Sequence, residues 1–384
     1  MLRVGIVANE ISGDRLGAGL IQALRVRCPD AEFEGVAGEQ MAAQGCRSLV
    51  PLEQLSVMGL VEILGHLPRL LGIRRRLFRH FRDNPPDLFI GVDAPDFNLG
   101  LARRLRRTGI KTVQYVSPTV WAWRAGRIKT LRQSVDLVLS IFPFEQPILE
   151  SGGVPVRYVG HPLLEQIPPQ VDQAAARRAL GLAPHGVLIA LLPGSRISEI
   201  QGLAADFLGA ARWCRERRPD LAFVTPLASA PLRACFDEIR ERVAPDLPLR
   251  LVDGASHQVL AAADLVLTAS GTATLEALLH GRPMVVGYRL HPLSYFLAKH
   301  LGLVKVPHVA MANLLAGEEL APELIQHACN PEALGRALMG LLEDPGRQEE
   351  IRAAYARIQA EMRRAGTSGA AEAVLQLLGK PADD

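Results

Sequence analysis

Short apolar segments rich in β-branched residues alternate along this chain with stretches of helical periodicity. The apolar segments form two sets, the first at 2–8, 32–37, 87–92, 110–116, 136–141 and 156–159 and the second at 187–192, 221–225, 249–252, 264–268 and 284–288. Helical patterns such as 97–107, 199–217 and 271–279 lie between them. Strands that are apolar on both faces and separated by helices form parallel sheets covered on both sides. The sequence therefore predicts an α/β fold with two doubly wound parallel sheets.

The 384 residues are enough for two domains. Residues 162–186 carry a Pro-Pro pair and then a polar helical pattern, which makes them the best linker candidate. We expect an N-terminal domain at 1–165, a C-terminal domain at 166–345, and a helical tail at 346–384 that packs back on the N-terminal domain or on a partner subunit. Ligands of such sheets bind at the carboxyl ends of the strands, so the turns there should line an interdomain cleft.

Cysteine usage and charge narrow the functional classes. Five scattered cysteines without a C-x-x-C pair disfavour a disulfide framework or a zinc site and favour a reducing compartment. The N-terminus has no charged leader, and no run of about 18 apolar residues occurs, so we expect a cytoplasmic protein. Residues 66–132 carry a net charge of +11 in a chain of net charge +3, which indicates an anionic partner.

The second half contains two turns suited to an anion. In "LLPGSRISEI" (191–200) a strand is followed by Gly194, Ser195 and Arg196 and then by a helix. Free N–H groups at a helix start and a guanidinium together favour a phosphate or pyrophosphate. The spacing does not match the P-loop of ATPases. The alternative is an ordinary strand-to-helix turn with a surface arginine.

The stretch "TASGTATLEALL" (268–279) has the same features at a second helix start. Its candidate anion-binding residues are Ser270, Gly271, Thr272 and Thr274. Glu276, on the first turns of that helix, could accept both hydroxyls of a ribose, or could simply complement the helix dipole. Two such helix starts in one half predict a nucleotide diphosphate.

The turns of the first half carry carboxylates and hydroxyls. Asp93 ends a buried strand in "LFIGVDAPDFN" (88–98) and could remove a proton from an alcohol, whereas we expect Asp96 to cap the following helix. In the opening turn we expect Asp14 to cap helix 15–27, which leaves Glu10 and Ser12 for a hydroxylated ligand.

A third turn of the first half, "QYVSPTVWAWR" (114–124), contains Ser117, Trp121 and Trp123. Aromatic area there could form a wall against a sugar or an acyl group. The alternative is a loop with one buried indole.

Residues 67–82 alternate large apolar side chains with arginines at helical spacing. An interfacial helix would place its apolar side in a bilayer or against acyl chains and its arginines at anionic headgroups. The candidates for membrane or acyl contact are Leu67, Leu70, Leu71, Leu77, Phe78, Arg75 and Arg76. The alternative is a core-facing helix with a solvated basic face. Basic and aromatic residues do not interleave as in nucleic-acid binders, so no nucleic acid is expected.

Taken together, the motifs "NEISGD", "VMGLVEIL", "DAPDFN", "YVSPTVWAWR", "VGHPL", "LLPGSR", "SGTATLEALL", "PMVVGY" and "NLLAG" resemble those of the lipid-A-disaccharide synthases over residues 3 to 380. The resemblance implies the GT-B glycosyltransferase fold, with two Rossmann-like domains, and an inverting reaction that needs no metal or other cofactor. It implies UDP-diacylglucosamine as donor, diacylglucosamine 1-phosphate as acceptor, and a β-1,6-linked disaccharide and UDP as products.

The same resemblance implies an acceptor-binding, membrane-facing N-terminal domain and a C-terminal domain for the UDP-sugar. It also implies a peripheral enzyme on the inner face of the inner membrane, while a homodimer is left open by the sequence.

Residues carry over by motif. Asp93 matches the essential carboxylate of the family and Glu10 the acidic residue of the first turn, which is the alternative base. Arg196 matches the arginine at the UDP phosphates, and Glu276 and Asn313 match further residues of the UDP site. This chain departs from the family at Asn9, where the family has a glycine, and in "VAMAN" before "NLLAG". If position 9 required a positive φ, asparagine would be the least costly substitute.

Three other functions are weighed against this one. A UDP-N-acetylglucosamine 2-epimerase on the same scaffold would need no lipid acceptor. A nucleotide-sugar sensor would bind its ligand without changing it. A dehydrogenase is disfavoured because no G-x-G-x-x-G motif follows a strand.

Overall fold

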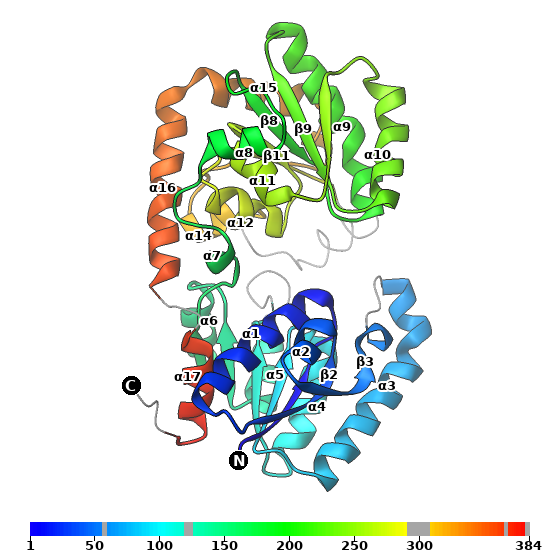
Figure 1. Cartoon of the computed structure of the whole chain (residues 1–384), viewed down its shortest axis with the longest axis vertical. Coiled ribbons are helices and arrows are strands. Elements are labelled where there is room, and N and C mark those ends of the chain that lie inside the picture. Colours follow the sequence, from blue (N-terminus) through cyan, green and yellow to red (C-terminus); the bar gives the residue numbers. More distant parts are fainter. Residues whose placement is uncertain (56–59, 119–125, 290–307, 365–367, 381–384) are drawn as a thin grey trace. The chain divides into compact units, whose positions relative to one another are not determined.

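A computed structural model of the chain describes residues 1–55, 60–118, 126–289, 308–364 and 368–380. The chain divides into two compact units (Figure 1). The first unit comprises Met1–Pro162 together with Met362–Asp384, and the second comprises Leu163–Glu361. Among the described residues, no helix is both long enough and apolar enough to cross a membrane.

The first unit is built on one parallel sheet. Its strands are β1 (Arg3–Val7), β2 (Glu32–Ala37), β3 (Cys46–Pro51), β4 (Leu88–Val92), β5 (Lys111–Tyr115), β6 (Leu137–Ser140) and β7 (Val156–Tyr158). Their order is β3-β2-β1-β4-β5-β6-β7, and every pairing is parallel. The central strand β4, "LFIGV", is buried along its whole length, as expected for a strand covered on both faces.

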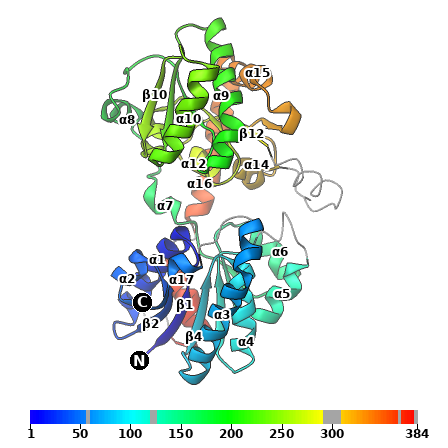
Figure 2. The ribbon, with the colours of Figure 1, turned by 90° about the vertical axis from the view of Figure 1, so that its right-hand side faces the viewer.

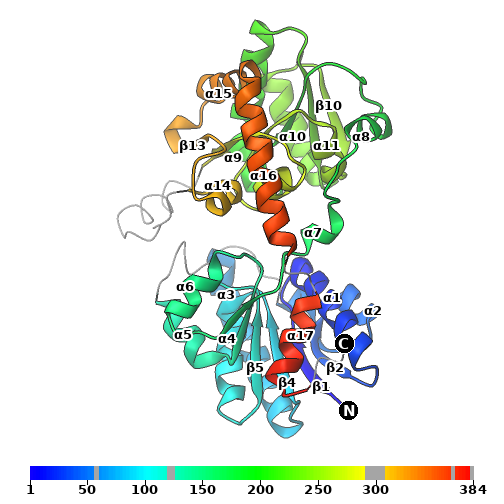
Figure 3. The same cartoon turned by 90° about the vertical axis from the view of Figure 1, so that its left-hand side faces the viewer.

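Helices cover this sheet. They are α1 (Ile11–Arg27), α2 (Glu39–Ala43), α3 (Leu60–Asp83), α4 (Pro95–Arg106), α5 (Arg127–Ser134), α6 (Glu145–Ser151) and α17 (Ser368–Leu377). Helix α1 contacts α2 and α17, whereas α4 packs between α3 and α5 and against β4 and β5 (Figure 3). The 3-10 turn Leu52–Gln54 follows β3.

The second unit repeats this plan. Its strands are β8 (Leu188–Leu192), β9 (Ala222–Leu227), β10 (Leu249–Asp253), β11 (Leu265–Thr268), β12 (Met284–Tyr288) and β13 (Glu323–Ile325). Their order is β10-β9-β8-β11-β12-β13, again all parallel.

Helices also cover the second sheet (Figure 2). They are α7 (Leu163–Gln166), α8 (Gln173–Ala179), α9 (Ile197–Arg217), α10 (Ala230–Val243), α11 (Ser256–Ala262), α12 (Thr272–Leu279), α14 (Met311–Ala316), α15 (Pro331–Glu343) and α16 (Pro345–Arg363). Helix α9 packs against α10 and α15. A Cβ at Gly335 would lie 2.5 Å from the ring of Trp213, so glycine lets α15 approach α9 closely.

The C-terminal helices belong to both units. Helix α16 lies in the second unit as far as Glu361, and α17 lies in the first. The Tyr158 hydroxyl donates to the Met362 carbonyl at 2.9 Å, and Arg157 lies 3.9 Å from Glu372. The strand β7 therefore holds the end of the chain in the first unit.

Each sheet has one point where the strand order reverses. In the first unit the chain runs β1, β2, β3 and then crosses back to β4, beside β1. In the second unit the equivalent neighbours are β8 and β11. Doubly wound sheets bind ligands outside the carboxyl ends of the strands at this point. The turns that follow these four strands are therefore the places to look for a site.

Candidate active site

Asp93 follows β4 directly, in an unusual backbone conformation. Its φ is 52°, and that of the next residue, Ala94, is 37°. Left-handed conformations of residues other than glycine cost about 1–3 kcal/mol and gather at functional sites. The Asp93 N–H donates to the Tyr115 carbonyl at 2.8 Å. Asp93 is thus held at the edge of the sheet by its main chain.

The Asp93 carboxyl group is half-buried. Burial raises the pKa of Asp93, while a hydrogen bond from the Ala94 backbone opposes the shift. A carboxylate whose pKa is raised accepts a proton more readily than an ordinary surface aspartate. This arrangement suits a general base.

The turn after β1 brings a second carboxylate to the same edge. Glu10 is exposed and occupies the N-cap position of α1, and Ser12 is exposed in the first turn of that helix. Asn9 is buried and does not have a positive φ. The condition under which asparagine would be the least costly substitute for the glycine of the family is therefore not met. The Asn9 side-chain oxygen lies 3.4 Å from the Asn98 Nδ2.

A cavity of about 280 Å³ adjoins these turns. It is lined by Asn9, Glu10, Leu55, Leu67, Leu70, Leu71, Arg74, Ala94, Asp96 and Phe97. Apolar side chains thus share a hollow with two carboxylates. Three of the residues expected to contact acyl chains, namely Leu67, Leu70 and Leu71, line it.

The remaining candidates on α3 lie in different environments. Leu77 is 1 % exposed and packs in the core, which corrects the expectation that it contacts acyl chains or a bilayer. Phe78 is half-buried, with the Arg104 guanidinium 3.9 Å from its ring centre. Arg75 and Arg76 are exposed. The helix therefore combines a core-facing side with a basic, solvated side.

Asp14 and Asp96 are not the N-caps of the helices that we expected them to cap. Asp14 lies inside α1 and accepts hydrogen bonds from the N–H groups of Gly38, Gln40 and Met41 at 2.8–3.1 Å. It therefore caps α2 rather than its own helix. Asp96 lies in the first turn of α4, whose N-cap is Ala94, and accepts from Arg127 at 2.7 Å.

The loop after β5 is described only in part. Ser117 is buried, and its hydroxyl donates to the Pro118 carbonyl at 3.0 Å. Trp121 and Trp123 lie outside the described residues.

In the second unit, the turn after β8 depends on Gly194. Its φ is 141°, and a Cβ there would lie 2.3 Å from the Cβ of Glu199. Arg196 is the N-cap of α9. The Glu199 carboxylate accepts from the N–H groups of Ser195 at 2.7 Å and Arg196 at 3.3 Å. This capping box fills the helix start with the chain's own carboxylate.

Arg196 itself remains accessible. Its side chain is 64 % exposed, with the guanidinium 3.4 Å from Glu199. We did not identify Glu199 from the sequence, although a glutamate three residues after an N-cap is the usual signal of a capping box. A phosphate bound here would meet the guanidinium first and would compete with Glu199 for the backbone N–H groups.

The turn after β11 also depends on a glycine. Gly271 has a φ of 105° and is the N-cap of α12, and Thr272 beside it is exposed. Ser270 is half-buried. Thr274 is fully buried, where its hydroxyl donates to the Gly271 carbonyl at 2.7 Å and accepts from the Met311 N–H at 2.9 Å. Thr274 therefore holds the turn in shape.

Glu276 is half-buried one turn further along α12, and burial raises its pKa. Asn313, on α14, is fully buried. Its amide nitrogen donates to Ala321 and Glu323, both at 2.8 Å, and its oxygen accepts from Leu320 and Ala321. All four hydrogen-bonding positions of this side chain are therefore used within the protein, which leaves its amide no free donor or acceptor for a ligand.

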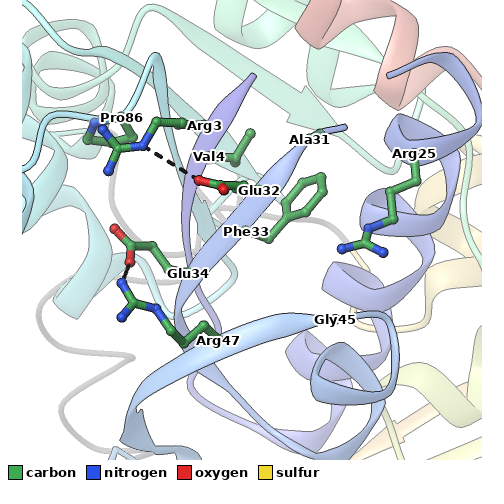
Figure 4. Close-up of a pocket in the computed structure, with 10 residues that line it drawn as sticks. All are labelled: Arg3, Val4, Arg25, Ala31, Glu32, Phe33, Glu34, Gly45, Arg47 and Pro86. Atoms are coloured by element: carbon green, nitrogen blue, oxygen red, sulfur yellow. Dashed lines mark hydrogen bonds and ion pairs between the residues drawn. The ribbon is translucent and has the colours of Figure 1, made fainter. Parts of the chain in front are cut away.

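Another cavity, of about 420 Å³, lies at the opposite end of the first sheet (Figure 4). Arg3 and Glu32, which begin β1 and β2, lie 3.9 Å apart across it. Glu34 pairs with Arg47 and with His80, the latter at 2.9 Å. Because this cavity lies away from the carboxyl ends of the strands, we do not assign the reaction to it. Within the described ranges, no group of three or more His, Cys, Asp or Glu residues could hold a metal ion.

Comparison with known proteins shows the family to which the chain is similar. The family model described as "Lipid-A-disaccharide synthetase" matches residues 4–377. A lipid-A-disaccharide synthase of Alkalilimnicola ehrlichii is 52 % identical over 380 residues, covering 98 % of this chain and 99 % of the relative.

Solved structures share the fold at low sequence identity. A putative UDP-N-acetylglucosamine 2-epimerase from Listeria monocytogenes has a TM-score of 0.63 at 15 % identity, covering 97 % of this chain and 95 % of its own. The calicheamicin glycosyltransferase has a TM-score of 0.62 at 17 % identity, covering 100 % of both chains. The two parallel-sheet units are thus those of the GT-B fold, as the sequence predicted.

Proposed function

This chain belongs to the lipid-A-disaccharide synthetase family, and on that premise we propose the reaction that it catalyses. As a member of the family it is a glycosyltransferase of lipid A synthesis. We propose that the donor is UDP-2,3-diacylglucosamine and the acceptor is 2,3-diacylglucosamine 1-phosphate. The acceptor 6-hydroxyl attacks the anomeric carbon with inversion, which forms the β-1,6 linkage and releases UDP.

The observation that carries this proposal is the position of Asp93, which directly follows β4 at the point where the strand order of the first sheet reverses. The Asp93 carboxylate takes the proton from the 6-hydroxyl as the new C–O bond forms. The raised pKa of this carboxyl group supports the role, because it strengthens the base. Glu10 is the alternative base, since it lies on the neighbouring turn and is exposed.

The second unit holds the UDP in this proposal. Negative charge grows on the diphosphate as the bond to the sugar breaks. The Arg196 guanidinium and the start of α12 would stabilise it, and the start of α9 would add to this once its N–H groups are released from Glu199. Preorganised donors of this kind are worth roughly 10²–10³ in rate each. The Glu276 carboxylate would accept the two ribose hydroxyls.

The acyl chains of the acceptor are assigned to the first unit. The apolar side of the 280 Å³ cavity, formed by Leu67, Leu70 and Leu71, supports this assignment. The exposed Arg75 and Arg76 on the same helix suit an anionic membrane surface. We propose that the enzyme works at the inner face of the inner membrane as a peripheral protein.

The experiment that tests the reaction is mass spectrometry after incubation with both diacyl substrates in detergent. The expected products are the tetraacyl disaccharide 1-phosphate and UDP, in equal amounts. Asp93→Asn, which keeps the shape of the side chain, is the matched control and should give almost none. Epimerised UDP-sugar in the absence of acceptor would favour a 2-epimerase, and bound but unchanged UDP-sugar would favour a sensor.

A further inference from the structure

Strained backbone gathers at the carboxyl ends of two neighbouring strands. Among the described residues, those other than glycine with a positive φ include Asp93 and Ala94 after β4 and Val116 after β5, at 72°. A β-branched residue such as valine avoids this region more strongly than most. Strained conformations persist only where the surrounding structure holds them. Something must therefore hold these two turns.

Two buried amides lie against both turns. Asn98 of α4 and Gln114 of β5 are fully buried. Each donates from its side-chain nitrogen to the Asp93 carbonyl at 2.9 Å. Asn98 also donates to the Val92 carbonyl at 3.2 Å, and Gln114 to the Val116 carbonyl at 3.3 Å. The carbonyl of Asp93 thus accepts hydrogen bonds from both amides.

Close packing brings the amides together. A Cβ at Gly91 would lie 2.7 Å from the Cβ of Asn98 and 3.1 Å from the Oε1 of Gln114, so only glycine leaves room for both side chains over β4. Asn98 also reaches the Val7 carbonyl and the Asn9 side chain, each at 3.4 Å. The same amide therefore touches the turn that carries Glu10.

The amides hold these turns at some cost to stability. The buried Asn98 Oδ1 and Gln114 Oε1 accept no hydrogen bond from the described residues. A buried acceptor without a donor destabilises a fold. Their nitrogen atoms, in contrast, donate to the carbonyls of the strained turns, which apolar side chains would leave without these partners. The two amides therefore fix the main chain of these turns while their own oxygens accept no hydrogen bond within the described part of the chain.

We propose that Asn98 and Gln114 are positioning residues, which hold the Asp93 carbonyl so that the left-handed turn presents the Asp93 carboxyl group to the acceptor hydroxyl. The inference rests on the proposed role of Asp93 as the base. Neither amide touches the substrate. Each acts through the main chain of Asp93, because the direction of a side chain follows from the φ and ψ of its own residue.

The test compares Gln114→Met and Asn98→Leu, which keep side-chain volume and remove the donors, with Thr112→Val. Thr112 is the matched control because it is also fully buried and also makes side-chain hydrogen bonds, to Ser134 and Asp136, but near the opposite end of the same strand. A misplaced base costs about 10²-fold in kcat, and we expect that loss in both amide variants. KM and the Kd of UDP should stay within about threefold, because ground-state binding is not altered.

A pH profile separates positioning from simple loss of fold. In the native enzyme kcat should rise as Asp93 loses its proton, at a pH raised by burial. When the turn relaxes and Asp93 becomes hydrated, this rise should move to lower pH in Gln114→Met and Asn98→Leu, but not in Thr112→Val. If Gln114→Met does not fold, Gln114→Ala also removes the donor without adding bulk and should show the same loss of kcat.

Two results would overturn the proposal. One is a kcat in both amide variants equal to that of Thr112→Val. The other is a parallel fall of kcat, UDP binding and melting temperature with an unmoved pH profile, which would indicate a purely structural role. Asp93→Asn is measured beside them. Its full activity would remove Asp93 as the base, whereas its inactivity together with active amide variants would remove only the positioning role.

Discussion

Asp93 combines a proposed catalytic role with a cost in stability. Because burial raises its pKa, the folded protein holds the proton more tightly than the unfolded chain. The free energy of unfolding therefore falls as pH rises from the ordinary carboxyl pKa through the raised one. At neutral pH the folded state bears the full cost of this buried charge.

For Asp93→Asn we expect turnover to fall by about 10²–10⁴ while the melting temperature at neutral pH rises. The amide cannot accept the proton, and it also carries no buried charge. Steady-state kinetics and calorimetry on the same preparation measure the two effects. A variant that is inactive but less stable than the native protein would contradict the assignment of the raised pKa to Asp93.

Arg196 can be tested without disturbing the fold, because its side chain is 64 % exposed. A charge-assisted hydrogen bond contributes about 1.5–3 kcal/mol, so Arg196→Ala should weaken UDP binding by roughly 10- to 100-fold. Arg212, which is 60 % exposed further along the same helix, gives the control Arg212→Ala with unchanged binding. Titration calorimetry measures the Kd of UDP for both variants. An unaltered Kd in Arg196→Ala would place the diphosphate elsewhere.

At the scale of elements, α3 shows how one helix can serve two environments. Leu77 and Phe81 are buried in the core, whereas Arg75 and Arg76 on the same helix are exposed. Helical periodicity alone was compatible with a core helix and with an interfacial helix, and the packing shows that its apolar side is largely used inside the first unit. Only its exposed or half-buried positions, such as Leu67 at 44 %, remain for a membrane.

The double variant Arg75→Glu/Arg76→Glu should bind vesicles containing anionic lipid more than about tenfold more weakly, since each arginine near such a surface contributes about 1 kcal/mol. Arg212→Glu/Arg242→Glu changes the net charge equally at exposed helical positions of the second unit and serves as the control. Sedimentation with vesicles measures both. Equal loss in the two double variants would indicate a general charge effect and no specific role for α3.

At the scale of the whole chain, each unit contains a buried histidine that burial keeps neutral. The pKa is lowered from 6.5 to about 4 for His161 in the first unit and for His280 in the second. The unfolded chain then takes up protons that the folded protein does not bind. Stability is therefore complete above about pH 6.5 and is lost as pH falls toward 4.

We expect the urea midpoint to fall between pH 6.5 and pH 4, and to fall less in His161→Asn and His280→Asn, which cannot take up the proton. Urea unfolding at a series of pH values measures this. His185, which is exposed, provides the control variant His185→Asn. A pH slope unaffected by either buried substitution would mean that other groups cause the acid unfolding.

Much of the architecture could be predicted from local pattern. Each predicted strand is present in the structure. The structure also contains two strands that the pattern did not predict, β3 and β13. Strand β3 has exposed residues and lies at the sheet edge, and β13 has three residues. The turns picked out at Glu10, Asp93, Arg196 and Ser270 follow the strands at the two switch points.

The sequence by itself determined the alternation of strands and helices, the turns that bear functional groups, and the family. Period, glycine placement and motif are local properties, since each is written in adjacent residues. Only the tertiary structure decided that Asp14 caps α2, that the Asn313 amide makes all its hydrogen bonds within the protein, and that Asn98 holds the Asp93 turn. The physical reason is that hydrogen-bond partners are chosen by packing across crossovers, and the bond from Asn98 to Val7 spans 91 residues.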